Sequence, residues 1–192
     1  MAGLVLKECE DVLRDVGSIF LQINNVINNS MLNFCTLFNS IYLTRGLAMY
    51  YSLEKQCRDF HLYIFAFDTP TYETLTVLNL PKATIISLKD FENEALLSIK
   101  SSRTVGEYCW TCTPSSIIYC LDTYGLSSCT YIDADLFFFS DPVVLVKELR
   151  VNESVIITDP RYTPKYDQTA ISGKHCVQFV YFKNDEQGRK VL

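Results

Sequence analysis

One short stretch, Thr130–Pro142 with the sequence TYIDADLFFFSDP, constrains the fold and the chemistry of this chain most strongly. An apolar segment, Thr130–Ile132, leads directly into two carboxylates, Asp133 and Asp135, which are separated only by Ala134. Residues i and i+2 of an extended backbone point to the same side. The side chains of Asp133 and Asp135 can therefore converge on one point just past the end of a buried strand.

The spacing of these two carboxylates indicates a site for a divalent cation. Carboxylates at such close range repel each other unless a cation, a proton or a hydrogen-bond donor lies between them. Mg²⁺ or Mn²⁺ shared with a diphosphate is the usual solution, because these cations prefer oxygen ligands and keep coordination sites for phosphate. The alternative is that Asp133 and Asp135 only cap a turn, since a D-x-D sequence is common by chance. The apolar strand before the pair and the aromatic run after it favour the metal site.

The size and charge of the chain indicate a globular domain that does not bind nucleic acid. Its 192 residues suffice for a substantial core, and a hydrophobic content of 48% excludes a disordered chain. The net charge is −5, and the Lys and Arg residues are spread along the sequence. This distribution argues against nucleic acid or an anionic membrane surface as the main partner.

Neither a membrane span nor a secretion signal is expected. The sequence contains no run of about 18 apolar residues, the length that a spanning helix needs. The opening residues, MAGLVLKECEDVL, carry acidic groups where a secretory signal needs an apolar core. We therefore expect a cytoplasmic protein, either free or at the cytoplasmic face of a membrane.

The chain has eight cysteines, most of them inside apolar segments. Without a secretion signal, we expect reduced thiols that pack as small hydrophobic side chains. Cys109 and Cys112 form a C-x-x-C motif, for which a redox pair or half of a zinc site is the alternative. No second C-x-x-C accompanies it, and only His61 and His175 could complete a zinc site. Packing is therefore the favoured interpretation.

Residues 1–30 differ in pattern from the rest of the chain. Their apolar residues recur at intervals of three and four, which predicts an amphipathic helix with one apolar seam. The pattern lasts about three heptads, the lower limit for a coiled coil. We favour a helix packed on its own domain; the alternative is a helix that pairs with a second copy or a partner chain. A polar, Asn-rich break then places a domain boundary near Ser30, before a domain of residues 31–192.

Beyond that boundary, apolar strand-like segments alternate with helical ones. We expect strands at Phe34–Phe38, His61–Phe67, Ala83–Leu88, Thr130–Ile132, Ser154–Thr158 and Val177–Phe182. We expect helices at Leu43–Gln56, Thr71–Leu78, Asp90–Ile99, Thr113–Tyr124 and Val143–Leu149, and a further one beginning at Gln187. The helix at Thr113 is expected to have Thr113 as its N-cap and Pro114 at its first position. Alternating strands and helices predict an α/β fold with a mostly parallel sheet flanked by helices.

A ligand site is expected at the carboxyl ends of the strands. Open parallel sheets bind ligands there, at the point where the strand order reverses. The first strand ends near Asn39, and the carboxylate pair follows a later strand. If these strands are neighbours, Asn39 and Asp133 face one crevice that could bind a nucleotide. The first strand is not followed by G-x-G-x-x-G, and G-x-x-x-x-G-K-[ST] occurs nowhere, so a dinucleotide-binding fingerprint and a P-loop are both disfavoured.

Four segments, taken in order, resemble segments of one known enzyme superfamily. CTLFNSIYLTRGLAMYYSL at 35–53 is similar to its opening strand and helix, which hold the nucleobase and ribose. CWTCTPSSIIYCL at 109–121 is similar to the helix that leads to the metal strand, and TYIDADLFFFSDP to the D-x-D segment itself. GKHCVQFVYFKNDEQGRKVL at 173–192 is similar to the later strand and turn beside the donor sugar. Residues 32–192 thus resemble a GT-A glycosyltransferase of the nucleotide-diphospho-sugar transferase superfamily, most closely the glycogenin-like family 8 type.

The resemblance implies a role for the loop after the first strand. Thr36, Asn39 and Tyr42 would line the nucleotide pocket. The loop is a residue shorter than the corresponding loop of glycogenin.

The resemblance also implies residues for the metal and the donor sugar. Asp133 and Asp135, with Ala134 between them, would bind Mn²⁺ or Mg²⁺ and, through the cation, the diphosphate. Arg103 lies in the loop where the family often places a cation for the donor. Gln178 stands near the position where many relatives have an Asn close to the sugar.

The activity implied by the resemblance is that of a metal-dependent glycosyltransferase. Such an enzyme moves a sugar from a nucleotide-diphosphate donor to an acceptor hydroxyl of a glycan, a lipid-linked sugar or a protein. The cation would stabilise the leaving diphosphate as a Lewis acid, and no residue is assigned as a catalytic base. Family members usually continue past the position of Leu192, with a His that completes the metal site. The resemblance therefore also implies a chain that is truncated at its C-terminus.

Two other functions remain open from the sequence. The first is a catalytically inactive remnant or binding subunit that keeps the fold and the nucleotide pocket. The second is a nucleotidyltransferase that makes nucleotide-sugars, which would have a Gly-rich first loop with a basic residue. Residues 38–46 contain only Arg45 and Gly46 of these types, so the nucleotidyltransferase ranks lower.

Overall fold

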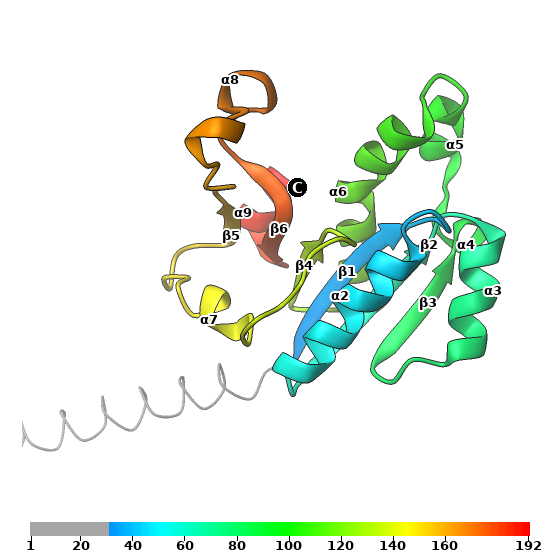
Figure 1. Cartoon of the computed structure of the whole chain (residues 1–192), viewed down its shortest axis with the longest axis horizontal. Coiled ribbons are helices and arrows are strands. Elements are labelled where there is room, and N and C mark those ends of the chain that lie inside the picture. The colour runs from blue at the N-terminus through cyan, green and yellow to red at the C-terminus, as the bar shows by residue number, and fades with distance from the viewer. Residues whose placement is uncertain (1–30) are drawn as a thin grey trace, which may run out of the picture. The chain divides into compact units, whose positions relative to one another are not determined.

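The fold is built on a six-stranded sheet with the strand order β3-β2-β1-β4-β6-β5 (Figure 1). The computed structural model describes residues 31–192, so the helix expected within residues 1–30 lies outside the described residues. The strands are β1 (Leu32–Phe38), β2 (Phe60–Ala66), β3 (Ala83–Ser87), β4 (Ser128–Ile132), β5 (Val155–Thr158) and β6 (Cys176–Lys183). The helices are α2 (Leu43–Gln56), α3 (Thr69–Leu78), α4 (Leu88–Phe91), α5 (Glu94–Lys100), α6 (Val105–Thr123), α7 (Val143–Val146), α8 (Thr169–Ser172) and α9 (Glu186–Val191), with a 3₁₀ turn, η1, at Pro164–Tyr166.

The predicted α/β fold with a mostly parallel sheet is confirmed. Strand β1 pairs in parallel with β2 on one side and with β4 on the other, and β2 pairs in parallel with β3. Strand β6 runs the opposite way and pairs antiparallel with both β4 and β5. The strand order reverses between β1 and β4, because the chain leaves β1 toward β2 and β3 and returns to the other side of β1 with β4.

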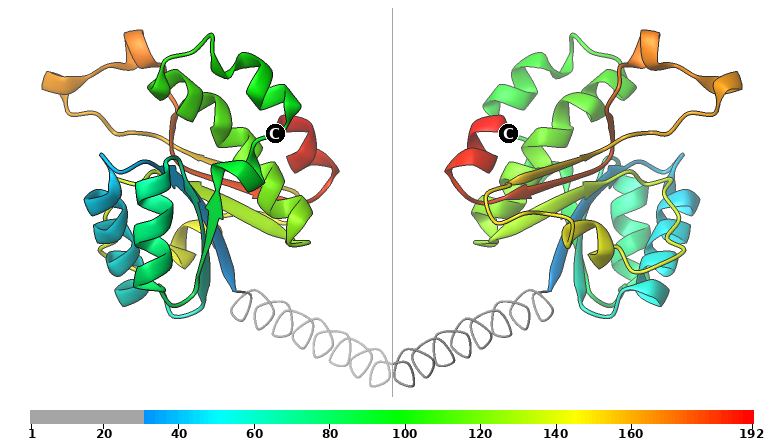
Figure 2. Two further views of the ribbon diagram at one scale, coloured as in Figure 1. Left: turned by 90° about the vertical axis from the view of Figure 1, so that its right-hand side faces the viewer. Right: turned by 90° about the vertical axis from the view of Figure 1, so that its left-hand side faces the viewer.

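Strand β1 lies at the centre of the core, and all of its residues are buried. Its side chains alternate between the two faces of the sheet, as those of any strand do. Phe34 and Phe38 pack into a cluster with residues of α2 and α3, whereas Cys35 and Leu37 pack into a cluster with residues of α6. The helices therefore cover both faces of the sheet (Figure 2). Burial on both faces explains why apolar residues predominate on both sides of this strand.

Helix α6 begins earlier than the sequence predicted. A capping box starts it at Thr104: the side chain of Thr104 accepts from the backbone N–H of Glu107, and the side chain of Glu107 accepts from the backbone N–H of Thr104. The expected start at Thr113 was wrong, because Thr113 and Pro114 lie inside the helix. Pro114 is exposed, so water can replace the backbone hydrogen bond that a proline removes. Gly125, with a φ of 61°, follows the end of the helix as expected.

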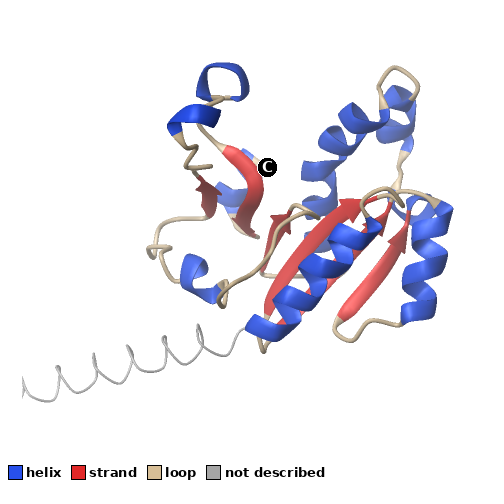
Figure 3. Cartoon of the chain, in the orientation of Figure 1, coloured by secondary structure: helices blue, strands red, loops and turns tan. Residues whose placement is uncertain are grey.

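Two other segments differ from expectation in their detail (Figure 3). The helix expected over Asp90–Ile99 is divided into α4 and α5, because Asn93 caps a new helix by accepting from the backbone N–H of Leu96 at 3.0 Å. The expected loop Arg161–Lys174 contains η1 and α8. The other expected elements lie within a few residues of their predicted bounds. No helix in the described part of the chain combines the length and the apolar character needed to cross a bilayer.

Candidate functional site

A pocket of about 400 Å³ opens at the carboxyl ends of β1 and β4. Three segments line it: the end of β1 with the loop that follows, within residues 37–42; the first turns of α6, within 105–110; and the end of β4 with the carboxylate pair, within 131–135. Strands β1 and β4 are neighbours with Cys35 paired to Tyr131, which is the arrangement on which the predicted crevice depended. The pocket lies where the strand order reverses, the position at which open sheets of this kind bind ligands.

The loop after β1 is held in place by hydrogen bonds to the side chains of Asn39 and Asp68. The Oδ1 atom of Asn39 accepts from the backbone N–H of Ile41 at 3.2 Å, which forms an Asx turn. Asp68, at the end of β2, accepts from the backbone N–H and the hydroxyl of Ser40 at 2.9 and 2.7 Å. Burial raises the pKa of Asp68, but the hydrogen bonds from Thr71 and Ser40 outweigh it and lower the pKa to about 2. The charged carboxylate therefore ties this loop to the next strand at neutral pH.

The two carboxylates at the end of β4 differ in their surroundings. Asp133 is half-buried, and its backbone N–H donates to the carbonyl oxygen of Gln178 at 3.0 Å, whereas Asp135 is exposed. Burial raises the pKa of the Asp133 carboxyl, a hydrogen bond with Tyr131 lowers it, and the charge of Asp135 raises it, so that the net shift is upward. The buried Tyr131 thus reaches the carboxylate two residues along the strand, on the same side.

The donor set fits a hard divalent cation. Asp133 and Asp135 line one pocket and offer only oxygen ligands, which Mg²⁺ and Mn²⁺ prefer. Part of the raised pKa of Asp133 comes from the charge of Asp135, and a cation between the two would relieve that repulsion. None of the described residues that line the pocket is a Lys or an Arg. The pocket is therefore negatively charged by its own side chains.

The structure brings together most, but not all, of the site residues that the sequence indicated. Five line the pocket together: Asn39, Tyr42, Asp133, Ala134 and Asp135. The guanidinium of Arg45, on α2, lies 4.7 Å from the centroid of the Tyr42 ring.

The other three site residues that the sequence indicated do not line the pocket. Thr36 is fully buried inside β1, on the face that carries Phe34 and Phe38, and its side chain does not line the pocket. Arg103 is exposed in the loop before α6 and does not line the pocket. Gln178 reaches the site through its backbone carbonyl, which accepts from Asp133. The roles that the resemblance implies for these three side chains stay predictions.

Sequence reasoning missed the wall that α6 contributes. Val105, Gly106, Cys109 and Trp110 line the pocket, and Trp110 is 73% exposed. The capping-box sequence T-x-x-E at Thr104 was the signal that could have placed this helix start beside the site. Cys109 of the C-x-x-C motif faces the pocket, while Cys112 is buried in the core.

The C-x-x-C motif does not form a metal site with other described residues. The residues that the structure describes contain one group of three or more potential metal ligands in close contact, and neither Cys109 nor Cys112 belongs to it. Burial raises the pKa of both thiols, that of Cys112 to about 11. None of the cysteines within residues 31–192 forms a disulfide.

Comparisons with known proteins find relatives of unestablished function. No model of a known protein family matches the chain. The uncharacterized protein YfnD of Bacillus subtilis strain 168 is 34% identical over 145 residues, which cover 73% of this chain and 46% of YfnD. The uncharacterized protein YfnF of the same organism is 28% identical over 166 residues, covering 83% of this chain and 55% of YfnF. The chain thus spans about half the length of the curated relatives it matches.

Solved structures establish the fold. The apo form of the glycosyltransferase GlyE of Streptococcus pneumoniae matches with a TM-score of 0.52 at 12% identity, over 84% of this chain and 36% of GlyE. The galactosyltransferase LgtC, solved with donor and acceptor sugar analogues, matches with a TM-score of 0.52 at 9% identity, over 82% of this chain and 60% of LgtC. The chain has the GT-A glycosyltransferase fold. At these identities the likeness covers the fold, and the chemistry has to be argued from the pocket itself.

Proposed function

We propose that this chain is the donor-binding domain of a metal-dependent glycosyltransferase that uses a nucleotide-diphosphate sugar. The observation that carries the proposal is the charge of the pocket at the reversal of strand order. Asp133 and Asp135 line it, and none of its described lining residues is a Lys or an Arg. A diphosphate carries negative charge, and like charges in a confined site repel each other. A nucleotide diphosphate can therefore bind there only with a cation, which the two carboxylates are suited to hold.

Each of the named residues would have its own role in binding the cation and the donor. Asp133 and Asp135 would hold Mn²⁺ or Mg²⁺, which supplies Lewis-acid stabilisation of the leaving diphosphate when it is bound. Tyr131 would keep the Asp133 carboxylate oriented through its hydrogen bond. Tyr42, from the loop after β1, and Trp110, from α6, both line the pocket and offer aromatic faces for a nucleobase or a sugar ring. The acceptor hydroxyl would attack the anomeric carbon of the donor.

A nucleotide-binding domain without turnover is the second candidate. Catalysis of this kind gains from positioned cations beside the leaving group. Arg103, the cation that the resemblance implied for this role, is exposed and does not line the pocket, which favours this candidate. Both candidates share the metal-dependent pocket, and they differ only in whether the sugar is released.

Release of nucleoside diphosphate from a panel of nucleotide-sugars, with and without Mn²⁺, separates the two candidates. A transferase hydrolyses its donor slowly even without an acceptor, so we expect Mn²⁺-dependent release from one donor and its loss in Asp135→Asn. The matched control is Asp59→Asn, an exposed carboxylate away from the pocket. Binding without release would support the non-catalytic candidate. Metal-independent binding or release would contradict both.

A further inference from the structure

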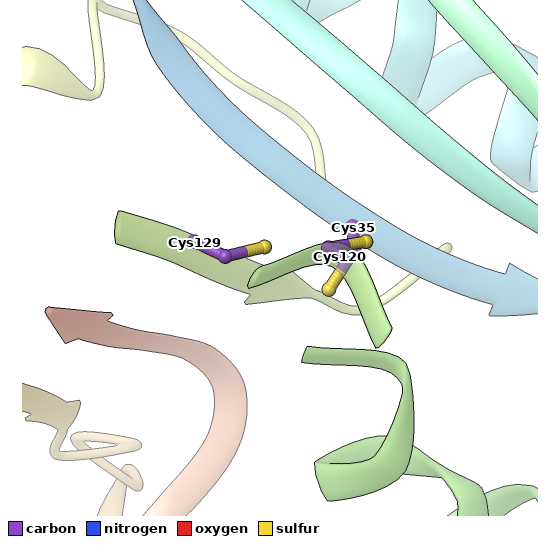
Figure 4. Close-up of side chains that lie close together, drawn as sticks. All are labelled: Cys35, Cys120 and Cys129. Atoms are coloured by element: carbon purple, nitrogen blue, oxygen red, sulfur yellow. The ribbon is translucent and has the colours of Figure 1, made fainter. Parts of the chain in front are cut away.

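Three cysteines from three different elements converge in the core. Cys35 comes from β1, Cys120 from α6 and Cys129 from β4, and their Sγ atoms all lie within 4.8 Å of one another (Figure 4). All three side chains are fully buried, with an exposed fraction of 0%. The hydroxyl of Ser116, one turn before Cys120 on α6, lies 3.8 Å from the sulfur of Cys35.

The convergence follows from the fold. Strands β1 and β4 are paired neighbours, and both Cys35 and Cys129 point to the face that α6 covers. Cys120 projects from α6 into the same hydrophobic cluster. Three different elements therefore place three soft ligand atoms around one point from which water is excluded.

The ligand number and the chemistry of the group select a narrow class of ion. Thiolate ligands favour soft ions such as Cu(I), as well as zinc and iron–sulfur centres. A structural zinc ion takes four protein ligands, and the described residues offer no fourth His, Cys, Asp or Glu within this group. A zinc ion that keeps an open position would need water, which the burial of the three sulfurs excludes. An ion that accepts three sulfur ligands fits both observations.

The spacing of the sulfurs also suits three-coordination. With a metal–sulfur distance of about 2.3 Å, three sulfurs in a plane around one ion lie about 4 Å apart. The three Sγ atoms, within 4.8 Å of one another, would reach this geometry by small side-chain rotations. No strand or helix has to move.

The protons on the three sulfurs set the charge balance of binding. Burial raises the pKa of Cys120 and Cys129, so these two stay protonated at neutral pH. Burial also acts against ionisation of Cys35, but hydrogen bonds with Cys120, Cys129 and Ser116 outweigh it and lower the pKa of Cys35. Binding of Cu(I) as a thiolate complex would release the thiol protons to solvent, with no change in oxidation state.

We propose that Cys35, Cys120 and Cys129 form a three-sulfur site for one soft monovalent ion, with Cu(I) as its representative. The ion links β1, β4 and α6, the three elements whose ends line the pocket. Its binding stabilises the folded chain, because the unfolded chain does not hold the three sulfurs together. The proposal is independent of the proposed function, since it uses none of the pocket carboxylates.

The test is an anaerobic titration of the full, reduced chain with Cu(I) in competition with a Cu(I) chelator. We compare the unaltered chain with a variant in which the other five cysteines are replaced by alanine, and with Cys120→Ala. We expect one tightly bound Cu(I) per chain in the unaltered and the five-cysteine variants, and affinity at least about 100-fold weaker in Cys120→Ala. A thermal midpoint raised by roughly 5 °C on Cu(I) binding should accompany the first two and be absent from the third.

Equal affinity in Cys120→Ala, or loss of the tight site in the five-cysteine variant, would overturn the proposal. If either variant fails to fold, X-ray absorption of the unaltered chain with one equivalent of Cu(I) decides the question. Three sulfur neighbours at about 2.3 Å would support the site. Two sulfur neighbours, or no tight binding to the folded chain, would refute it.

Discussion

At the scale of one residue, the charge of Asp133 that the proposed cation site needs lowers the stability of the metal-free chain. Its carboxyl is half-buried beside another carboxylate, and its pKa is raised. The folded state therefore favours the protonated form. The contribution of this group to the free energy of unfolding is highest below its ordinary pKa, 3.8, and falls as pH rises through the higher folded pKa. At neutral pH the charged Asp133 destabilises the metal-free chain.

Replacing Asp133 with asparagine should therefore stabilise the metal-free chain at pH 7. The variant has no charge to bury and no repulsion from Asp135, and the gain should shrink to nothing below about pH 4. Urea unfolding across a pH series measures this difference, with Asp59→Asn as the exposed control. A variant that is less stable than the unaltered chain at pH 7 would show that the hydrogen bond with Tyr131 matters more than burial and repulsion.

Which site residues could be predicted from sequence depended on how local their geometry is. The convergence of Asp133 and Asp135 follows from strand alternation alone, and the structure places both in one pocket. The burial of Thr36 does not follow from its neighbours in sequence, because it depends on packing of α2 and α3 over that face of the sheet. Trp110 could be placed only once the start of α6 was known.

At the scale of one element, the start of α6 was decided by competition between two local signals. Thr113–Pro114 and Thr104–Glu107 both match the pattern of a helix N-terminus. The capping box at Thr104 satisfies two backbone N–H groups, whereas Pro114 only removes one donor, so the helix extends through the proline. The sequence pattern alone does not show which of the two signals starts the helix, because a proline inside a helix is tolerated where the helix is exposed to water.

Loss of the Thr104 cap should weaken the helix that lines the pocket. Thr104→Ala is expected to lower the free energy of unfolding by about 1 kcal/mol, because the backbone N–H of Glu107 loses its partner. Thr76→Ala, in the interior of α3, is the control and should be neutral or slightly stabilising, since alanine favours helix. Chemical denaturation measures both. Equal effects of the two substitutions would show that the capping box does not stabilise α6.

The packing of α2 on β1 gives a second prediction at this scale. A Cβ atom on Gly46 would lie 2.6 Å from ring atoms of the buried Phe38, which lines the pocket from β1. Gly46→Ala should therefore destabilise the chain by about 1–3 kcal/mol. Gly106→Ala on α6 meets no atom within 4 Å and should stabilise it by about 0.5–1 kcal/mol. The midpoints of thermal unfolding of the two variants should shift in opposite directions. A higher midpoint in Gly46→Ala would contradict the close approach of α2 to β1.

At the scale of the whole molecule, alternating periodicity predicted most of the elements and the parallel part of the sheet. The sequence did not indicate that β6 runs antiparallel between β4 and β5, since an apolar run such as Val177–Phe182 has the same pattern in either direction. That insertion places Gln178 opposite Asp133, and the backbone carbonyl of Gln178 accepts a hydrogen bond from the backbone N–H of Asp133. Strand order and direction are properties of long-range pairing, and they appear only when the whole sheet is assembled.

The central claim is that the pocket binds a nucleotide diphosphate only together with a divalent cation. Calorimetric titration of a panel of nucleoside diphosphates into the folded chain, with and without Mn²⁺, tests it directly. We predict binding of one nucleotide in Mn²⁺, no measurable binding in chelator, and loss of binding in Asp135→Asn but not in Asp59→Asn. Binding that is equally strong in chelator, or that survives in Asp135→Asn, would contradict the metal site and with it the proposed function.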